Sequence, residues 1–506
     1  MNIFKKILYF SIVFLFSKFS YADDGIDAAI DKWLTPISDF VVGKVFYSIS
    51  VAGADVKLIV LWLIAGSIFC TFYFNFINLK MFRHALDLVR GRYDKPESKG
   101  EVSHFQALST AISGTVGLGN IAGVAVAVAV GGPGATFWMI LAGFLGMSLK
   151  FCECTLGVKY RIINEDGTVS GGPMHYLSKG LAEKGQASLG KILAVFFSIC
   201  CIGGAIGGGN MFQANQSFQQ FVSVTGGDGS FFADKGWLFG LIISIILGFV
   251  IIGGIKSIAK VTSKLVPLMA IIYLAAGLVI ILINITGVPE AIIRIISEAF
   301  SPSAAAGGAL GALIIGFQRA AFSNEAGLGS APIAHSAVKS DKPVTEGIVS
   351  VLEPFIDTIV ICTVTALVIV ITGMYDARGD LTGIGLTSAA FATTISWFPF
   401  VLAIAAILFA FSTMIAWSYY GLKAWTYLFG NSKISENIFK IIFCVFIIIG
   451  SSVSLGSVLN LSDSMIFLMS VANLVGVYFL ASVVRSEVNK YLSDLSEGKI
   501  KRTDNN

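Results

Sequence analysis

Charged side chains and histidines are scarce in this sequence. Only 13% of its 506 residues are Asp, Glu, Lys or Arg, and only four are His. The motifs HExxH, G-x-S-x-G and GxxxxGK[ST] do not occur. Their absence argues against a zinc protease, a serine hydrolase and a nucleotide-driven pump within this chain. Hydrophobic residues make up 55% of the sequence, and the mean hydropathy is +0.81, which is typical of a polytopic membrane protein.

Cysteine is also scarce. All seven cysteines fall in apolar segments, so we expect no disulfide framework. Cys152 and Cys154 form a C-x-C pair on a predicted helix. With no second pair and no histidine nearby in the sequence, we interpret them as packing residues rather than metal ligands.

The N-terminus has the pattern of a cleavable signal peptide, residues 1–22. Lys5 and Lys6 precede a short apolar run, and Ser20-Tyr21-Ala22 has the small-x-small form of a cleavage site. The alternative is an uncleaved anchor helix. Residues 23–56 are predicted to be an external amphipathic segment.

Eleven later segments are long and apolar enough to cross a membrane, which predicts an all-α polytopic protein with one membrane domain over 57–484. The predicted spans are 57–79, 105–130, 134–158, 192–222, 237–255, 265–286, 306–336, 346–373, 398–422, 440–457 and 464–484. Two short external helices are expected at 289–300 and 385–397.

The basic residues predict the orientation. If the mature N-terminus lies outside, most of the 35 Lys and Arg residues fall on the cytoplasmic side. The cytoplasmic segments are then 80–104, 159–191, 256–264, 337–345, 423–439 and the tail 485–506. We therefore expect a multi-pass protein of a bacterial-type plasma (inner) membrane, with a cytoplasmic C-terminus.

The tripeptide Gly-Leu-Gly occurs twice within apolar sequence, at 117–119 and 327–329. Each copy lies in the first predicted helix of a group of five, 105–286 and 306–484, and the two groups start on opposite sides of the membrane. This pattern predicts an inverted repeat whose first helices break in the bilayer, as in many transporters. Chance is the alternative, because the chain has 54 glycines.

A helix that breaks in the membrane exposes backbone groups. Leu118 and Gly119 can present N–H groups to an anion, and Asn120 offers an amide oxygen. Carbonyls at the opposite side of the break suit a sodium ion. The alternative is that the glycines only let helices pack closely.

Four stretches carry a resemblance to a known family: SGTVGLGNIAGVA at 113–125, GGPMHYL at 171–177, GNMFQANQ at 209–216 and QRAAFSNEAGLGSAPIAH at 318–335. The first is similar to the first core helix of LeuT-type sodium-coupled transporters. Together they resemble the sodium:alanine/glycine symporter family. The resemblance implies a LeuT-like 5+5 inverted repeat with one additional N-terminal helix, here 57–79.

The resemblance also implies a function and a site. The function is sodium-driven import of a small neutral amino acid, alanine or glycine, by alternating access. The implied substrate-binding residues are Gly117, Leu118, Gly119, Asn120, Gln213, Phe317, Phe322, Ser323 and Asn324. Gln213 has an alternative reading as a hydrogen bond between helices. Many family members have Thr where this chain has Leu118, which leaves the selection of substrate size open.

The implied sodium site has five neutral oxygens. They are the carbonyls of Ser113, Val116 and Phe409 and the hydroxyls of Ser412 and Thr413. Sodium is a co-substrate here, and no other cofactor is expected. The expected surroundings are the lipid bilayer, with no nucleic acid, and the sequence leaves the oligomeric state open.

Charged residues that fall inside predicted spans include Glu153, Arg319, Glu325, Glu353 and Asp357. Glu353 and Asp357 share a helix face, and we expect Arg319 to pair with one of them. Such a network can be structural or can serve coupling. No histidine is expected among these carboxylates, so we expect no histidine proton relay, and a carboxylate relay stays open.

Three alternative functions are less consistent with the sequence. An intramembrane enzyme lacks a recognisable catalytic motif. A channel would show a repeated polar ring, whereas the polar residues cluster at two helix breaks. A proton-coupled transporter, or one for another substrate, with the same fold is the nearest alternative.

Overall fold

The structure is a computed structural model that describes residues 36, 40, 42–51, 54–94, 97–301 and 307–503. The expected signal peptide, 1–22, and the first part of the external segment 23–56 lie outside the described residues. The rest of that segment contains an antiparallel hairpin, β1 (Ser48–Val51) and β2 (Ala54–Lys57), in which Ser48 lies opposite Lys57. A second hairpin pairs β3 (Ile162–Ile163) with β4 (Val169–Ser170).

The remaining described elements are helical, as the composition predicts. Those up to residue 283 are α3 (Leu58–Tyr73), α4 (Ile77–Lys80), α5 (Phe82–Val89), α6 (His104–Thr115), the π-helix η1 (Gly119–Gly123), α7 (Val124–Gly131), α8 (Ala135–Lys159), α9 (Pro173–Glu183), α10 (Ala187–Ile206), the π-helix η2 (Gly207–Met211), α11 (Phe212–Val224), the 3-10 helix η3 (Gly227–Gly229), α12 (Gly236–Ile251) and α13 (Gly254–Ile283).

The second group begins with a short 3-10 helix. It comprises η4 (Ile285–Gly287), α14 (Val288–Ala299), α15 (Gly308–Asn324), α16 (Ala331–His335), α17 (Pro343–Ser350), α18 (Leu352–Pro354), the π-helix η5 (Phe355–Cys362), α19 (Thr363–Ile371), α20 (Met374–Ala377), α21 (Gly383–Thr394), α22 (Phe398–Phe429), α23 (Lys433–Ser452) and α24 (Leu455–Ser496). The short external helices expected at 289–300 and 385–397 correspond to α14 and α21.

Helices lie at all eleven predicted spans, but not all of them are long enough to cross unaided. Among the described residues, seven helices are long and apolar enough to span a membrane, or eight if α6 and η1–α7 form one bent span. The helices α3 and α12 are apolar but shorter. The count of eleven spans therefore stays a prediction.

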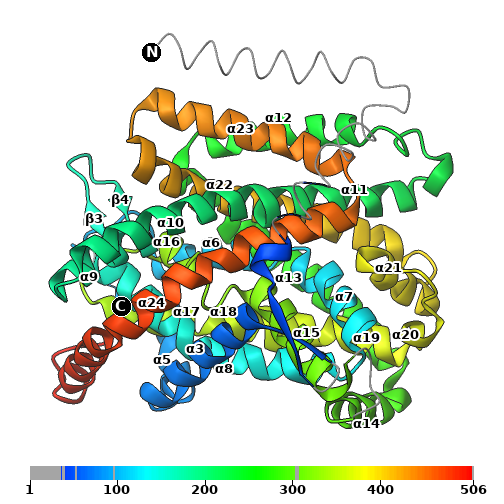
Figure 1. Ribbon diagram of the computed structural model, residues 1–506, viewed down its shortest axis with the longest axis horizontal. Coiled ribbons are helices and arrows are strands. Elements are labelled where there is room, and N and C mark those ends of the chain that lie inside the picture. Colours follow the sequence, from blue (N-terminus) through cyan, green and yellow to red (C-terminus); the bar gives the residue numbers. More distant parts are fainter. Residues whose placement is uncertain are drawn as a thin grey trace.

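The molecule has two distinct ends (Figure 1). The predicted cytoplasmic elements α5, α9 and the β3–β4 hairpin lie at one end, together with the C-terminus. The predicted external elements α14, α20 and α21 lie at the other end, and the long helices run between them. The structure thus separates the segments into the two groups that the charge pattern predicts.

Two helices extend beyond the predicted spans. The predicted cytoplasmic segment 256–264 is helical and forms the first part of α13. Its three lysines, Lys256, Lys260 and Lys264, recur every four residues and are exposed along one helix face, so the helix continues without burying charge. Likewise α24 runs to Ser496, beyond the predicted end of the last span at 484.

Both Gly-Leu-Gly helices are broken, as the sequence predicts. The first departs from helical geometry at Val116, whose ψ is 90°, and the chain bends by 51° between α6 and η1–α7. In the second, α15 ends at Asn324, and Glu325, Gly327 and Gly329 all have positive φ before α16 begins. Positive φ is the reason why two of these positions are glycine.

Arg319 does not pair with Glu353 or Asp357, so that expectation was wrong. Its guanidinium instead pairs with Asp463 on α24, and the neighbouring Gln318 donates to the same carboxylate at 3.0 Å. Both charged side chains are buried. Asp463 lies more than a hundred residues further along the chain, so no local spacing rule could connect the two.

Removing one partner of this buried pair should destabilise the protein strongly. We expect Asp463→Ala to lower the free energy of unfolding by about 3–5 kcal/mol, because Arg319 is left as an uncompensated buried charge. The double variant Arg319→Met/Asp463→Leu should regain most of this stability. Unfolding in detergent measures both.

The matched control is the half-exposed pair Arg294–Asp376. Asp376→Ala should cost less than about 1 kcal/mol. A similar loss for Asp463→Ala would contradict a structural role for the buried pair.

Candidate substrate and cation site at the helix breaks

The backbone N–H groups of the first break are held by side-chain oxygens. Leu118 N–H donates to Gln213 Oε1 at 2.9 Å, and Gly117 N–H donates to Asn120 Oδ1 at 2.9 Å. Gln213 Nε2 in turn donates to the carbonyl of Gly208 at 2.9 Å. In this conformation Leu118 is therefore not free to bind an anion, and the Gln213 amide oxygen occupies the position of its acceptor.

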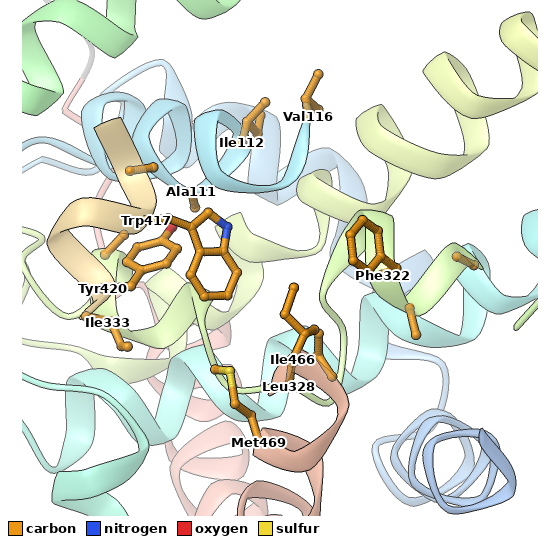
Figure 2. Close-up of a cluster of buried hydrophobic side chains, with 14 of the residues drawn as sticks. Ala111, Ile112, Val116, Phe322, Leu328, Ile333, Trp417, Tyr420, Ile466 and Met469 are labelled. Atoms are coloured by element: carbon orange, nitrogen blue, oxygen red, sulfur yellow. The ribbon is translucent and has the colours of Figure 1, made fainter. Parts of the chain in front are cut away.

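A small cavity adjoins this break. It has room for about one water molecule. Its lining joins both breaks with η2, α22 and α24, and consists of Gly114, Thr115, Gly119, Gly208, Gln213, Phe322, Glu325, Trp417 and Ile466. Figure 2 shows Trp417, Phe322 and Ile466 around the space below the end of α6. The described state is therefore closed around the predicted substrate site.

Aromatic side chains and Glu325 close this cavity. Trp417 Nε1 donates to Glu325 Oε1 at 3.0 Å and lies 3.2 Å from the carbonyl oxygen of Gly114. Phe322 packs edge-on against Phe212, with ring centroids 5.3 Å apart. Glu325 thus contacts an indole N–H from α22 and the Ser330 hydroxyl within its own break. The sequence placed Glu325 in the break but gave no signal for Trp417.

The second break contributes to two different places. Phe322 lines the cavity beside Gln213, but Phe317 and Asn324 line a separate small space with Leu63 and Ala142. Asn324 Nδ2 also donates to Thr358 Oγ1 at 2.9 Å. The structure therefore brings Phe322 to the first break, but not Phe317 or Asn324.

A buried carboxylate lies between the two breaks. Asp357 accepts from Asn120 Nδ2 at 2.6 Å, from the Ser323 hydroxyl at 2.9 Å and from the Thr358 hydroxyl at 2.6 Å. These three donors are neutral, so the carboxylate oxygens are hydrogen-bonded without a positively charged partner. Asp357 is thus part of the site, and an acidic residue in mid-span was the only signal for it in the sequence.

The end of α6 packs against α22 where the sodium residues were predicted. The Ser113 hydroxyl donates to the carbonyl of Ser412 at 2.6 Å, and the Ser412 hydroxyl donates to the carbonyl of Phe409 at 3.0 Å. Thr413 Oγ1 is buried and has no hydrogen-bond partner. A Cβ atom on Gly117 would lie 2.4 Å from this oxygen. Since Val116 has ψ of 90°, its carbonyl leaves the helical pattern beside the same contact.

All three π-helical segments among the described residues surround this region. The segment η1 follows the first break, η2 brings Gly208 to the cavity, and η5 carries Asp357. A π-helical turn displaces the backbone from regular hydrogen bonding and is frequent at functional sites. Here it turns polar groups of three membrane helices toward one place.

The expectation that no histidine lies among the buried carboxylates was wrong. His335 Nδ1 lies 2.5 Å from Glu346 Oε1, and His335 Nε2 contacts Glu353. Glu353 also pairs with Lys150 at 3.2 Å. Glu346 was missed because it lies at the edge of a predicted span.

This group also bears on metal binding. Ligand atoms of Cys154, His335 and Glu353 lie within 4.8 Å of one another, so Cys154 does have a histidine neighbour in space. However, both nitrogens of His335 face carboxylates, and the Lys150 ammonium already neutralises Glu353. The group is therefore an internal ion-pair network.

Two broken helices that meet at a buried polar site define a secondary transporter of the LeuT-like type. The fold is similar to that of MhsT in complex with L-phenylalanine, with a TM-score of 0.52, 19% sequence identity, and coverage of 76% of this chain and 89% of that chain. The sodium:alanine symporter family matches residues 41–505, and the chain belongs to this family.

Similar proteins extend over nearly the same length. The sodium/alanine symporter AgcS of Methanococcus maripaludis is 42% identical over 85% of this chain and 93% of its own length. The probable sodium/glutamine symporter GlnT of Bacillus subtilis is 33% identical over 88% of this chain and 89% of its own length. The chain is thus a member of a family of cation-coupled amino-acid transporters, which are not enzymes.

The contact between Gly117 and Thr413 gives a sharp test of the first break. Gly117→Ala should reduce amino-acid uptake per folded protein about tenfold or more, because the new methyl group displaces the Thr413 hydroxyl. Uptake into membrane vesicles, normalised to the amount of transporter, measures this.

The control is Gly123→Ala. Gly123 is also buried in η1, but a Cβ atom there meets nothing within 4 Å. Equal uptake by the two variants would show that close contact at Gly117 is not needed for transport.

Proposed function

We propose that this protein imports a small neutral amino acid, alanine or glycine, together with sodium by alternating access. The observation that carries the proposal is the buried, unpartnered hydroxyl of Thr413 beside the first helix break. A buried hydroxyl without a partner is unfavourable, and a bound cation would satisfy its oxygen.

The sodium ion would lie between the end of α6 and α22. Its proposed ligands are the hydroxyls of Ser412 and Thr413 and the carbonyls of Ser113, Val116 and Phe409. The Ser412 hydroxyl now donates to Phe409, so it must rotate for both oxygens to face a cation. An ion here would tie α6 to α22, which links sodium binding to the position of the broken helix.

The substrate would bind at the small cavity beside Gly117, Leu118, Gly119 and Asn120. We propose that its carboxylate replaces Gln213 Oε1 as the acceptor of the Leu118 N–H. Gln213 would then turn its amide toward the substrate. Phe322 would move to make room, because the cavity of the closed state holds only about one water molecule. Ser323 contributes through Asp357, while Phe317 and Asn324 would act from a neighbouring space.

The small size of alanine and glycine suits a cavity that is lined partly by glycines. Gly119 and Gly208 leave space only for a small side chain, and Trp417 and Ile466 limit it from the other side. The sodium/alanine symporter AgcS supports this substrate class. GlnT supports a larger substrate as the alternative, so a glutamine competition assay belongs in the first experiment.

Proton coupling is the second candidate. The observation that favours it is Asp357, a buried carboxylate without a cationic partner among its hydrogen-bond donors, which touches both breaks through Asn120 and Ser323. A carboxylate in this position can take up a proton as well as attract a cation. We rank proton coupling second because a proton on Asp357 would not give the buried Thr413 hydroxyl a partner.

We place the protein in a bacterial-type plasma membrane with its basic end in the cytoplasm. The two ends of the molecule carry the segments that the positive-inside rule assigns to opposite sides.

The first test is uptake of radiolabelled alanine into proteoliposomes, with an imposed sodium gradient and then with a proton gradient. Sodium-dependent uptake that glycine competes and glutamine does not would support the proposal. Uptake driven by protons alone would favour the second candidate, and lack of alanine uptake under both gradients would refute the substrate assignment.

Thr413→Val tests the cation site. We expect the half-saturating sodium concentration to rise about tenfold or more, because the hydroxyl ligand is lost. Thermal stability should not fall, since valine keeps the shape and removes an unsatisfied polar atom. Sodium titration of alanine uptake and melting in detergent measure the two effects.

Ser418→Ala is the matched control on α22. Its hydroxyl donates to the Ile415 carbonyl within the helix, at 2.7 Å. It should leave the sodium dependence unchanged. An unchanged sodium dependence in Thr413→Val as well would exclude this site.

A further inference from the structure

A continuous chain of five buried side chains lies near the basic end of the molecule. Glu346 contacts His104 Nδ1 through one oxygen and His335 Nδ1 through the other. His335 continues to Glu353, and Glu353 to Lys150. We call these five residues the relay. Four of them have no solvent exposure, and His104 is 4% exposed.

The geometry favours a charged His335. Both of its ring nitrogens face carboxylate oxygens, and an ionised carboxylate can only accept hydrogen bonds. With both carboxylates ionised, both nitrogens carry a proton, and His335 is an imidazolium between Glu346 and Glu353. The ion pairs compensate the cost of burying these charges within the protein.

His104 is the one member of the relay with any solvent exposure. The second ring nitrogen of His104 lies 3.9 Å from Asp94, whose side chain is 46% exposed. This distance is too long for a direct hydrogen bond, so a proton that passes between the solvent near Asp94 and the His104 ring would need a bridging water. The ring can relay such a proton, because imidazole donates through one nitrogen and accepts through the other. The other end, at Lys150, is fully buried.

The relay also joins one half of each broken helix. His104 is the first residue of α6, and His335 is the last residue of α16. Glu346 lies on α17, Glu353 on α18 and Lys150 on α8. The contact between His104 and Glu346 therefore connects α6 to the other four residues of the relay.

Backbone contacts hold the same junction. The N–H of Glu101 donates to the carbonyl of Ala337 at 2.7 Å, and the N–H of Lys339 donates to the carbonyl of Val102 at 2.8 Å. Arg161 donates to the carbonyls of Lys99 and Ser336, each at 2.8 Å. The start of α6 must break these contacts and the His104–Glu346 contact if it moves away from α16.

We propose that the relay is a proton-binding latch that holds the cytoplasmic end of α6 closed. The latch is tight when His335 is an imidazolium and Glu346 and Glu353 are ionised, and it loosens when His335 loses its proton to the cytoplasm. The latch thereby sets how often the cytoplasmic end of α6 moves away from α16, and this movement controls the release of the substrate. This inference rests on the alternating access and the orientation of the proposed function, but not on the identity of the substrate or the ion.

The sign of the pH effect follows from the charges around His335. Its own neighbours are the carboxylates of Glu346 and Glu353. The groups that face the relay from adjoining elements are Lys150, Glu153 and Cys154 on α8, Asp94 and His104 before and at the start of α6, Arg161 after α8, Glu325 in the second break and Tyr420 on α22. Three titratable groups of α5 and α24 have partners outside the relay: His84 contacts Tyr491, Asp87 pairs with Arg92, and Asp494 pairs with Lys342. Arg83 on α5 and Lys490 on α24 are two further charged groups of these helices.

Without the His335 proton, the neutral ring can donate to only one of its two carboxylates. The other carboxylate is then left beside it without a donor, and the contact that anchors α6 weakens. Rising cytoplasmic pH should therefore open the latch.

The experiment measures opening directly, without transport. Ser109, buried on α6, is replaced by cysteine in the full-length protein, and a membrane-impermeant maleimide is applied to inside-out vesicles. Labelling at position 109 is read by peptide mass spectrometry at pH 7 and pH 9. It is normalised to a Ser496→Cys protein, whose cysteine is exposed at the end of α24, which corrects for the reactivity of the thiol itself.

In the Ser109→Cys background we expect normalised labelling to rise about fivefold or more from pH 7 to pH 9. His335→Gln cannot carry the charge, so labelling at pH 7 should already be high and should not rise further. His104→Ala should likewise raise labelling at pH 7, because α6 loses its anchor.

Lys342→Gln is the matched control, since it breaks the nearby Lys342–Asp494 pair, which is not part of the relay. It should keep the low labelling and the pH dependence of the parent. The latch is refuted if His335→Gln retains the parent's pH dependence, or if Lys342→Gln opens position 109 as much as His104→Ala does.

The failure of the proposed function would look different. If the latch is correct but sodium and alanine are not the ligands, the pH dependence persists while neither compound changes the labelling. If sodium or alanine alters the labelling while pH does not, the proposed function is supported and the latch is refuted. Melting in detergent shows which variants are folded.

Discussion

The structure depends on the need to satisfy backbone hydrogen bonds where helices break inside a membrane. No water is available there for the freed N–H and C=O groups, so side chains must take that role. Gln213 and Asn120 do so at the first break, holding the N–H groups of Leu118 and Gly117. A substrate carboxylate oxygen can accept from the Leu118 N–H in place of Gln213 Oε1, so binding exchanges one hydrogen bond for another. The closed state is therefore stable without substrate, and the same N–H group can still donate to a substrate.

Buried charge imposes the second constraint. Arg319, Lys150 and His335 would each be very unfavourable alone, and each has a carboxylate within contact distance. The pairs join different elements: one joins α15 to α24, while the others join α8, α16 and α17–α18. A movement of the broken helices must therefore either keep these pairs intact or exchange their partners. His104 is the member of the relay that lies on α6, and it is the one member with any solvent exposure.

Sequence patterns predicted what is local and missed what is distant. Gly-Leu-Gly and its polar neighbours predicted both breaks, because a break is a property of a few successive residues. Gln213 and Thr413 came near the first break as the family resemblance implied. In contrast, the partners of Arg319 and Glu353 were not predictable from spacing, because Asp463 and Lys150 come from helices far away in the chain. Phe317 was assigned to the pocket together with Phe322 as a residue of the second broken helix, but their separation of five residues along α15 turns it to another face.

One helix connects the site with the relay. Glu353 and Asp357 are four residues apart, on α18 and η5, yet Glu353 faces His335 and Lys150 while Asp357 faces Asn120 and Ser323. A cation or proton that changes the charge near Asp357 acts on the same short helical segment that carries Glu353. A shift of this segment moves both carboxylates together, because a helix transmits displacement along its axis. The two breaks and the cytoplasmic junction thus need no separate connection, since their acidic groups belong to a single piece of backbone.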